Sequence, residues 1–291
     1  MNRRIIRVED INALFLEKLG HLYSVNEIRA FLDLLFQHFM GWSRSGILLN
    51  RDTVLPGNIL AGFSDALDAL SAHKPIQYIT GSTWFLGIKV AVRPGVLIPR
   101  PETEELVSWI LEENPPDIKQ KFTVVDIGTG SGCISIALKK FYPGATVWGI
   151  DRSVAALELA DENAKANDVS VMWSLSDILG RDELKKLPLA DWIVSNPPYV
   201  TESEKQGMQP NVLLHEPGEA LFVPDADPMR FYSAIAEFAS SHLIRPGRIY
   251  LDINERFGKM TCDLLSGHGF RNIRLRKDIH GKDRFVAAGP Q

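Results

Sequence analysis

From Phe122 onward, short apolar runs with the pattern of buried strands alternate with segments of helical periodicity. This order is typical of a parallel sheet whose strands are connected by crossover helices. The last two strands are the exception, because only the turn of residues 280–282 separates them and a helix does not fit there. We therefore predict that these two strands pair antiparallel, and that the fold class is α/β with a Rossmann-like sheet of seven strands. The strands are predicted near residues 122–126, 146–150, 170–174, 191–195, 248–253, 271–276 and 284–288.

The first 74 residues have a different pattern and are predicted to be helical. Ser24 and Glu27 form a capping-box pattern, and the apolar run that follows keeps helical spacing until Gly41, which is placed to end the helix. A second apolar stripe covers residues 59–72. These stripes predict the core of a small helical bundle, and any face that stays exposed could dock a partner.

Two short apolar segments lie between the helical region and the α/β part. Residues 76–79 and 88–92 are predicted to be strands of an extended or hairpin linker, with turns at Gly81 and Gly87. The predicted domains are a helical domain over residues 1–74, a β-hairpin linker over residues 75–98 and the α/β domain over residues 99–291.

A glycine-rich turn directly follows the first strand of the α/β part. Gly128, Gly130 and Gly132 allow the backbone to turn sharply and to approach a ligand without Cβ contacts. A dinucleotide-binding loop has a third glycine three residues after the second, but Cys133 stands at that distance from Gly130. The spacing therefore fits the dinucleotide pattern poorly and indicates a nucleoside site.

Acidic residues follow the next two predicted strands. Asp151 ends the second strand, where a carboxylate can accept hydrogen bonds from both hydroxyls of a ribose. Asp177 follows the third strand and is placed to accept from the exocyclic amine of adenine, with Ile178 against the purine face. Asp151 alone could be a helix cap, but the order of these residues on successive strand ends favours an adenosine site.

The fourth predicted strand is followed directly by a polar tetrapeptide, Asn196, Pro197, Pro198 and Tyr199. The Asn196 side-chain carbonyl and the Pro197 main-chain carbonyl can accept both N–H bonds of a carboxamide or of an exocyclic amine. The nitrogen of such a group shares its lone pair with a π system, so holding both hydrogens directs the lone pair toward an electrophile. The prolines remove competing N–H donors, and the Tyr199 ring can stack on a planar acceptor. Together with the nucleoside site, this clamp predicts methyl transfer from S-adenosylmethionine to a planar nitrogen.

The tetrapeptide alone does not separate an adenine amine from a glutamine or asparagine amide. The net charge of −4 gives no general attraction to nucleic acid, and the first 80 residues carry eight Lys/Arg and eight Asp/Glu. N6-methylation of adenine in DNA or RNA is therefore the second hypothesis. A non-catalytic nucleotide-binding module that docks a partner through its helical domain is the third.

The composition argues against a metal site, a disulfide framework and a membrane span. Cys133 and Cys262 stand far apart and in no spacing typical of a metal site, so we expect reduced thiols and no metal. No apolar run approaches the ~20 residues needed to span a bilayer. The expected location is the cytoplasm, without membrane attachment.

These motifs resemble those of the HemK/PrmC family, the glutamine methyltransferases of peptide chain release factors. The match covers about residues 74–288 and includes residues 75–81, residues 96–107, Glu216 with Pro217, and Ala220 with Leu221. The first two segments are the more selective ones, because adenine methyltransferases share the tetrapeptide. The resemblance implies a class I S-adenosylmethionine-dependent methyltransferase fold, with a small helical domain that recognises the substrate.

The resemblance also implies the activity and the site residues. The expected reaction is N5-methylation of the glutamine in the Gly-Gly-Gln motif of release factors, which leaves S-adenosyl-L-homocysteine as the second product. The release factor would be the protein partner, with no direct nucleic-acid contact, and the enzyme would be a monomer. S-adenosylmethionine would be contacted by Gly128, Thr129, Gly130, Ser131, Gly132, Asp151, Asp177, Ile178 and Asn196, and the acceptor glutamine by Asn196, Pro197, Pro198 and Tyr199, with Arg100, Glu102 and Glu216 at the pocket entrance.

One segment departs from the family pattern. Residues 252–257 read Asp-Ile-Asn-Glu-Arg-Phe where relatives often read Glu-Ile-Gly-x-x-Gln. Contacts specific to that strand end are therefore not carried over to this chain, whereas both binding motifs are unaffected.

Overall fold

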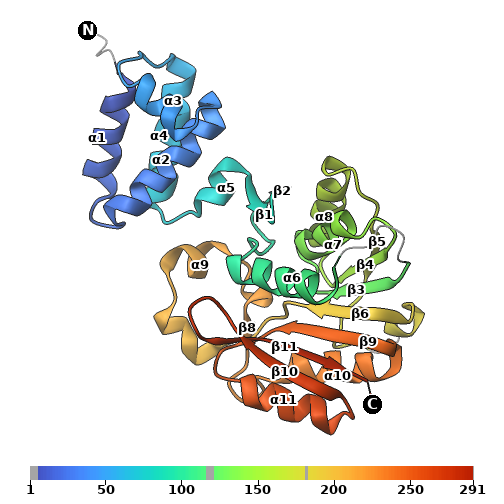
Figure 1. Ribbon diagram of the computed structural model, residues 1–291. Helices are drawn as coiled ribbons and strands as arrows, with labels where there is room; N and C mark the ends of the chain where they lie inside the picture. Colours follow the sequence, from blue (N-terminus) through green and yellow to red (C-terminus); the bar gives the residue numbers. More distant parts are fainter. Residues whose placement is uncertain (1–5, 116–120, 181–182, 291) are drawn as a thin grey trace. The chain divides into compact units, whose positions relative to one another are not determined.

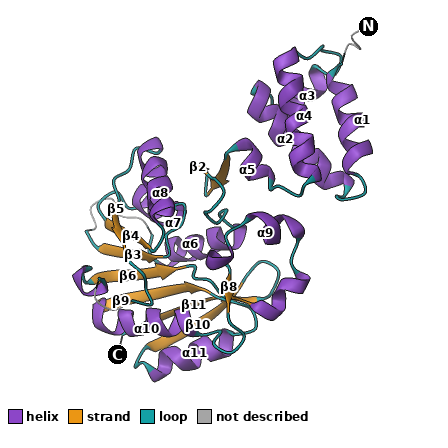
Figure 2. Cartoon of the chain, turned by 180° about the vertical axis from the view of Figure 1, so that it is seen from behind, coloured by secondary structure: helices purple, strands orange, loops and turns teal. Residues whose placement is uncertain are grey.

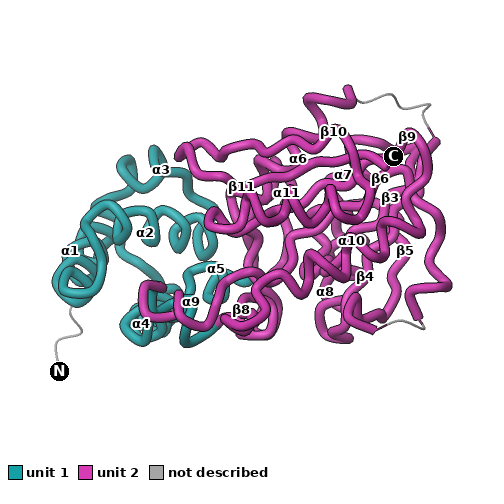
Figure 3. The backbone as a smooth tube through the Cα atoms, turned by 90° about the horizontal axis from the view of Figure 1, so that it is seen from below, with its two compact units in different colours: residues 1–81, 209–215 teal, residues 82–208, 216–291 magenta. Residues whose placement is uncertain are grey.

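The computed structural model describes residues 6–115, 121–180 and 183–290. The chain forms two compact units, one of Met1–Gly81 with Gln209–His215 and the other of Ser82–Met208 with Glu216–Gln291 (Figure 3). The first unit thus contains a short segment that is remote in sequence. The predicted domain boundaries at residues 74 and 98 stay a prediction. The two units are described separately below.

The first unit is helical (Figure 1). The predicted capping box is present, since Ser24 Oγ accepts from Glu27 N at 3.3 Å and Glu27 Oε2 accepts from Ser24 N at 2.9 Å. Gly41 ends the same helix with a left-handed φ of 69°. The helices of this unit are α1 (Val8–Leu19), α2 (Val25–Met40), α3 (Arg44–Leu49), α4 (Gly57–Ser71), α5 (Ile76–Thr80) and α9 (Pro210–His215).

The core of the helical unit is aromatic and aliphatic. Phe63 of α4 is 1% exposed and its ring contacts Phe15, Phe36 and Phe39, with centroid distances of 6.1, 4.6 and 5.2 Å. The predicted apolar stripes therefore do form the core of a small bundle, because the Phe63 ring of α4 packs against one ring of α1 and two rings of α2.

The prediction of a strand at residues 76–79 is wrong, because these residues form helix α5. The run Ile-Gln-Tyr-Ile is too short for its alternation to exclude one turn of helix. Pro75 precedes the helix, Gly81 ends it with a φ of 70°, and Ile76 is buried in the core of the helical unit. Tertiary packing therefore decides the conformation of this segment.

The hairpin lies next along the chain and belongs to the second unit. Strands β1 (Ser82–Phe85) and β2 (Ile88–Ala91) pair antiparallel. Leu86 and Gly87 form the two-residue turn with φ of 47° and 76°, the positive values that a tight hairpin of right-handed twist requires. The prediction of a turn at Gly87 and a strand after it is confirmed.

The second unit contains the predicted seven-strand sheet, in the order β10-β11-β9-β6-β3-β4-β5. Strand β11 runs antiparallel to both of its neighbours, β9 and β10, and the other pairs are parallel. The predicted fold class and the antiparallel pairing of the last two strands are confirmed. The strands are β3 (Thr123–Ile127), β4 (Thr146–Asp151), β5 (Met172–Leu175), β6 (Ala190–Ser195), β9 (Leu243–Asp252), β10 (Arg271–Lys277) and β11 (Asp283–Gly289).

Helices cover both faces of this sheet (Figures 1 and 2). One face packs against α6 (Pro101–Glu113), α7 (Cys133–Phe141) and α8 (Val154–Ala166), and the other against α10 (Arg230–His242) and α11 (Gly258–Gly267). Along β6, Trp192 and Val194 face the first group, whereas Ile193 faces the second. Strands buried on both faces explain the continuous apolar runs in the sequence. Shorter elements are η1 (Leu184–Lys186), β7 (Val200–Thr201), η2 (Glu202–Gly207), η3 (Gly218–Ala220) and β8 (Phe222–Val223).

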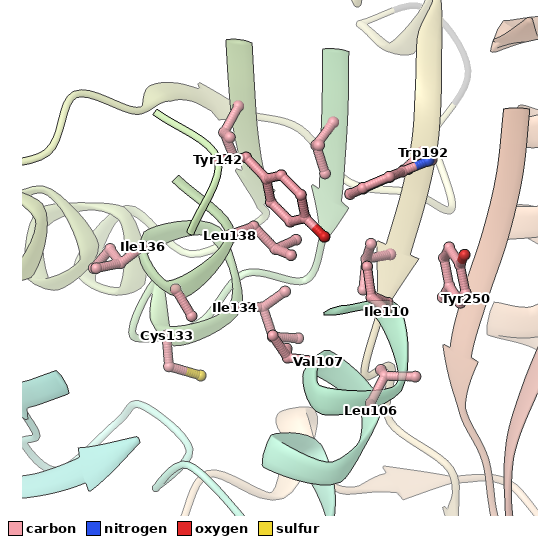
Figure 4. Packing of buried hydrophobic residues seen from close by; sticks show 14 of the residues in the cluster. Leu106, Val107, Ile110, Cys133, Ile134, Ile136, Leu138, Tyr142, Trp192 and Tyr250 are labelled. Atoms are coloured by element: carbon pink, nitrogen blue, oxygen red, sulfur yellow. The ribbon is translucent and has the colours of Figure 1, made fainter. Parts of the chain in front are cut away.

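Trp192 is the central ring of the first of these two cores (Figure 4). Its centroid lies 4.3 Å from that of Phe122, 5.2 Å from that of Tyr142 and 6.4 Å from that of Tyr250. Trp192 and Tyr250 belong to β6 and β9, Phe122 directly precedes β3 and Tyr142 directly follows α7, so one side chain joins several elements. None of the helices within the described ranges has the length and apolar content needed to cross a membrane.

We expect Trp192→Ala to lower the free energy of unfolding by about 3–5 kcal/mol, because it removes a large buried side chain and leaves a cavity. Trp84→Ala is the matched control, since Trp84 is 60% exposed on β1, and its loss should stay below about 1 kcal/mol. Urea unfolding of the full chain, followed by far-ultraviolet circular dichroism, measures both. Equal losses in the two variants would contradict this account of the core.

Candidate active site

The polar motifs predicted from the sequence lie at one edge of the sheet. Strands β3, β4 and β6 end side by side, because Ile127 of β3 is in register with Ile150 of β4 and with Ser195 of β6. Ser195 Oγ also donates to the main-chain oxygen of Ile127 at 2.7 Å. The loops after these strands therefore leave the sheet together, and ligands of open α/β sheets bind outside the carboxyl ends of the strands.

An open cavity lies at this edge, with about 1040 Å³ of empty space when the adjoining open solvent is included. Glycine backbone and carboxyl groups line it, which are features that suit a nucleoside with a short side chain. Most of the residues predicted to hold the cofactor contribute to its wall. Those that line it are Gly128, Thr129, Gly130, Ser131, Asp151, Asp177, Ile178 and Asn196. Pro197 and Pro198, predicted for the acceptor clamp, line it as well.

The glycine loop leads from β3 to α7 with a left-handed backbone. Gly128, Gly130 and Gly132 have φ of 72°, 55° and 81°. A Cβ added to Gly128 would meet no atom within 4 Å, so the backbone there faces open space that a ligand can fill. A Cβ on Gly132 would lie 3.0 Å from Ala160 Cβ, and Gly132 is outside the cavity wall that the described residues form. Gly132 therefore lets α8 approach the start of α7.

Asp126 fixes this loop from inside the protein. Its Oδ2 accepts from Thr129 Oγ1 at 2.6 Å, from Ser135 Oγ at 2.7 Å and from Ser135 N at 3.2 Å. Its Oδ1 has no hydrogen-bond partner in the described part of the chain. Burial raises the pKa of Asp126 to about 6, although the hydrogen bonds from Thr129 and Ser135 oppose that rise. The carboxyl group thereby connects the loop to the first turn of α7.

Asp151 and Asp177 present carboxyl groups after β4 and β5. Asp151 Oδ2 accepts from Gly130 N and its Oδ1 accepts from Ser153 N, both at 2.9 Å. Asp177 Oδ1 accepts from Leu179 N at 2.9 Å. Burial raises the pKa of Asp151, and the main-chain donors around it counteract this. Main-chain bonds thus orient both groups, and each carboxylate keeps further acceptor sites for hydroxyl or amino donors of a ligand.

Asn196 is the first residue after β6, and its side-chain amide has one fixed hydrogen bond. Nδ2 donates to Thr103 Oγ1 at 2.9 Å. Asn196 Oδ1 accepts no hydrogen bond from any residue in the described ranges. The amide is therefore oriented by its nitrogen, and its oxygen is available to a donor that enters the cavity.

A second cavity of about 270 Å³ shares part of its wall with the first. Asn196 and Pro197 line both cavities, whereas Tyr199 and Arg100 line only the smaller one. Tyr199 Oη accepts from Arg284 Nη1 at 3.4 Å, and desolvation raises the pKa of Tyr199, so the phenol stays protonated. The tetrapeptide that the sequence singled out thus forms the boundary between two adjoining spaces.

Arg100 and Glu216 form an ion pair that links two remote segments. Glu216 Oε1 accepts from Arg100 Nη2 at 2.7 Å and its Oε2 accepts from Ile98 N at 3.2 Å, with the Glu216 side chain 1% exposed. Within the described chain, Glu102 and Glu216 are not among the residues that line either cavity. Arg100 therefore reaches the smaller cavity, and Glu216 holds Arg100 in place.

The sequence did not identify several residues that line the larger cavity. Val96, Leu97 and Pro99 precede α6, and Phe231 belongs to α10. Residues 96–107 were noted only for their family resemblance, and an isolated phenylalanine in a helix gives no signal of a ligand site. Thr103 also lines the cavity, and its position as the hydrogen-bond partner of Asn196 required the tertiary structure.

Comparisons with known proteins agree with this geometry. The family described as the Methyltransferase small domain matches residues 104–222, and the PrmC N-terminal domain matches residues 15–81. The solved T. thermophilus 16S rRNA N2 G1207 methyltransferase, in complex with AdoMet and guanosine, is 21% identical with a TM-score of 0.53. That likeness covers 72% of this chain and 50% of the other, and it concerns the fold.

Curated relatives named release factor glutamine methyltransferase match nearly the whole chain. The proteins from Flavobacterium psychrophilum and Bacteroides thetaiotaomicron are each 41% identical over 96% of this chain and 98% of their own length. The protein from Enterococcus faecalis is 32% identical over 99% of this chain and 100% of its own. The resemblance inferred from the motifs is confirmed, and the chain belongs to the release factor glutamine methyltransferase family.

Proposed function

We propose that this protein transfers the methyl group of S-adenosylmethionine to N5 of the glutamine in the Gly-Gly-Gln motif of peptide chain release factors. One observation carries the proposal: Asn196 and Pro197 line both the large cavity and the small one. A group held by Asn196 from the smaller cavity therefore borders directly on the space that suits a nucleoside. Relatives that match nearly the full chain carry the corresponding name, which supports the same conclusion.

The residues of the larger cavity provide the groups that S-adenosylmethionine requires. Asp151 would accept from the ribose hydroxyls and Asp177 from the adenine amine, while Ile178 would lie against the purine. Gly128 leaves open space beside its backbone, and a Cβ on Gly130 would meet only Val96 Cγ1, at 3.9 Å. Thr129, Ser131 and Asn196 complete this side of the site.

When bound, S-adenosylmethionine supplies an electrophilic sulfonium methyl group. The protein positions the acceptor: Asn196 Oδ1 and the main-chain oxygen of Pro197 each accept one N–H of the glutamine amide. With both hydrogens held, the nitrogen lone pair is directed into the larger cavity, which supplies the geometry that the planar amide lacks in solution. The nitrogen gives its surplus proton to water after methylation, so no strong general base is needed. Tyr199, Pro198 and Arg100 would bound the glutamine side chain.

The helical domain, residues 1–74, would recognise the release factor, and the enzyme would act as a monomer. The balanced charge of this region favours a protein partner over direct contact with nucleic acid. Since its substrate acts in translation, the enzyme would work in the cytoplasm.

Incubation with labelled S-adenosylmethionine and a release factor is expected to label the factor, because its loop presents the glutamine amide. A release factor whose Gly-Gly-Gln glutamine is replaced by alanine should stay unlabelled, and mass spectrometry of the wild-type factor should show one added CH₂. Persistent labelling of the altered factor would refute the assignment. Methylation of adenine oligonucleotides with none on release factor would favour the second hypothesis.

Asn196→Ala should reduce methyl transfer roughly a hundredfold or more, because it removes an oriented acceptor used in the transition state. The Kd for S-adenosylmethionine, measured by calorimetry, should change much less. Asn167→Ala is a control, since Asn167 donates to the main-chain oxygens of Lys89 and Asn163 and does not line either cavity in the described chain. Wild-type turnover in Asn196→Ala would exclude the proposed role.

Asp151→Asn should raise the Kd for S-adenosylmethionine about tenfold or more, because hydrogen bonds to a charged acceptor contribute roughly 1.5–3 kcal/mol. Asp168→Asn is the matched control: Asp168 is exposed with a φ of 56°, which asparagine also adopts. Calorimetric titration of both variants tests this, and an unchanged Kd in Asp151→Asn would remove Asp151 from the cofactor site.

A further inference from the structure

Asp252 is a buried carboxyl group at the end of β9 that the reaction described above does not use. The residue is 1% exposed, and its Oδ1 has no hydrogen-bond partner among the described residues. A buried carboxylate with an unsatisfied oxygen is costly, so its retention here calls for a specific role. Its other oxygen, Oδ2, accepts from Thr103 Oγ1 at 3.2 Å.

Thr103 connects Asp252 to the acceptor clamp. Thr103 is 2% exposed at the start of α6, and its Oγ1 accepts from Asn196 Nδ2 at 2.9 Å. A hydroxyl group has one proton. Because Thr103 gives that proton to Asp252, its oxygen faces Asn196 only as an acceptor, and the NH₂ end of the Asn196 amide must point toward it.

We propose that Thr103 and Asp252 are positioning residues, which together hold the Asn196 amide with its oxygen turned to the acceptor. The alternative orientation exchanges the oxygen and the NH₂ group of Asn196. It would place the Asn196 oxygen against Thr103 Oγ1, whose proton is already given to Asp252. The NH₂ group of Asn196 would then face the N–H groups of the glutamine amide, which would have no acceptor at this position. The chain of hydrogen bonds from Asn196 through Thr103 to Asp252 thus selects one of the two orientations of the Asn196 amide. This inference rests on the proposed function, because it assigns the amide oxygen to the glutamine.

The negative charge of Asp252 determines which group donates in each of these hydrogen bonds. Burial raises the pKa of Asp252 to about 7, with Arg284 and Thr103 lowering it and Glu102 and Asp278 raising it. Tyr199 and Tyr232 also face this carboxyl group, and burial raises the pKa of both phenols, so they stay neutral. Ionised Asp252 can only accept a hydrogen bond, whereas the protonated form can also donate one to Thr103. As the pH falls through about 7, the hydrogen bonds therefore no longer enforce a single orientation of Asn196.

The first test replaces the hydroxyl group while keeping the shape of the side chain. Thr103→Val should lower kcat roughly tenfold to a hundredfold, since misplacing a reacting group has effects of this size. Thr103→Ser keeps the hydroxyl and should retain most of the activity, and KM for the release factor should change little in either variant. Thr261→Val is the control for a buried threonine outside the site, because Thr261 donates within α11 to the Phe257 oxygen. Wild-type kcat in Thr103→Val, or an equal loss in Thr103→Ser, would overturn the proposal.

The second test uses no release factor, so it separates this proposal from the proposed function. In ¹⁵N-labelled protein, the side-chain amide signals of Asn196 are identified by their loss in Asn196→Ala. We expect these signals to titrate near pH 7 in the wild type and to lose that titration in Asp252→Asn and in Thr103→Val. If the Asn196 signals titrate but the labelling experiment shows no methylation of a release factor, the proposed function is rejected and the coupling between Asp252 and Asn196 is kept. Signals that do not respond to pH in the wild type would reject the coupling, and circular dichroism shows whether each variant is folded.

Discussion

The register between β3 and β6 is the constraint on which the site depends. Ile127 lies opposite Ser195, and the hydroxyl group of Ser195 donates to the Ile127 oxygen. The next residue on each strand, Gly128 and Asn196, therefore leaves the sheet at the same level. A shift of one residue would exchange the faces of all side chains on β6, moving Trp192 out of its aromatic cluster. The position of the clamp and the packing of the core are thus fixed by the same pairing.

Carboxyl groups at strand ends are a second common element. Asp126, Asp151 and Asp252 end or nearly end β3, β4 and β9, and burial raises the pKa of each. Donors offset the cost of burial in different ways, through hydroxyl groups for Asp126 and Asp252 and through main-chain N–H groups for Asp151. Each group thereby fixes a loop or a side chain of the site. The strand ends therefore hold the site in position as well as providing groups that bind a ligand.

The sequence predicted the parts that depend on local pattern. The central strands are continuous apolar runs because they are buried on both faces, and the short turn before β11 required antiparallel pairing. The glycine loop and the tetrapeptide were recognisable because each is a short motif that directly follows an apolar strand run. The remainder depends on contacts across the chain. Residues 76–79 form a helix because Ile76 packs into the helical core, and Thr103 stands 93 residues from Asn196 and 149 from Asp252. Local periodicity contains no information about such distances.

The chain leaves the sheet-containing unit after Met208, adds α9 to the helical unit and returns at Glu216. His215, the last residue of α9, contacts the Ala72 oxygen at 2.9 Å through Nε2, and Glu216 is the buried partner of Arg100. Adjacent residues are thus anchored in different units. The helical unit is consequently discontinuous in sequence, and severing the chain at Gly81 alone would leave two covalent tethers between the units. A fragment ending there would lack α9 and would therefore not contain the whole helical unit.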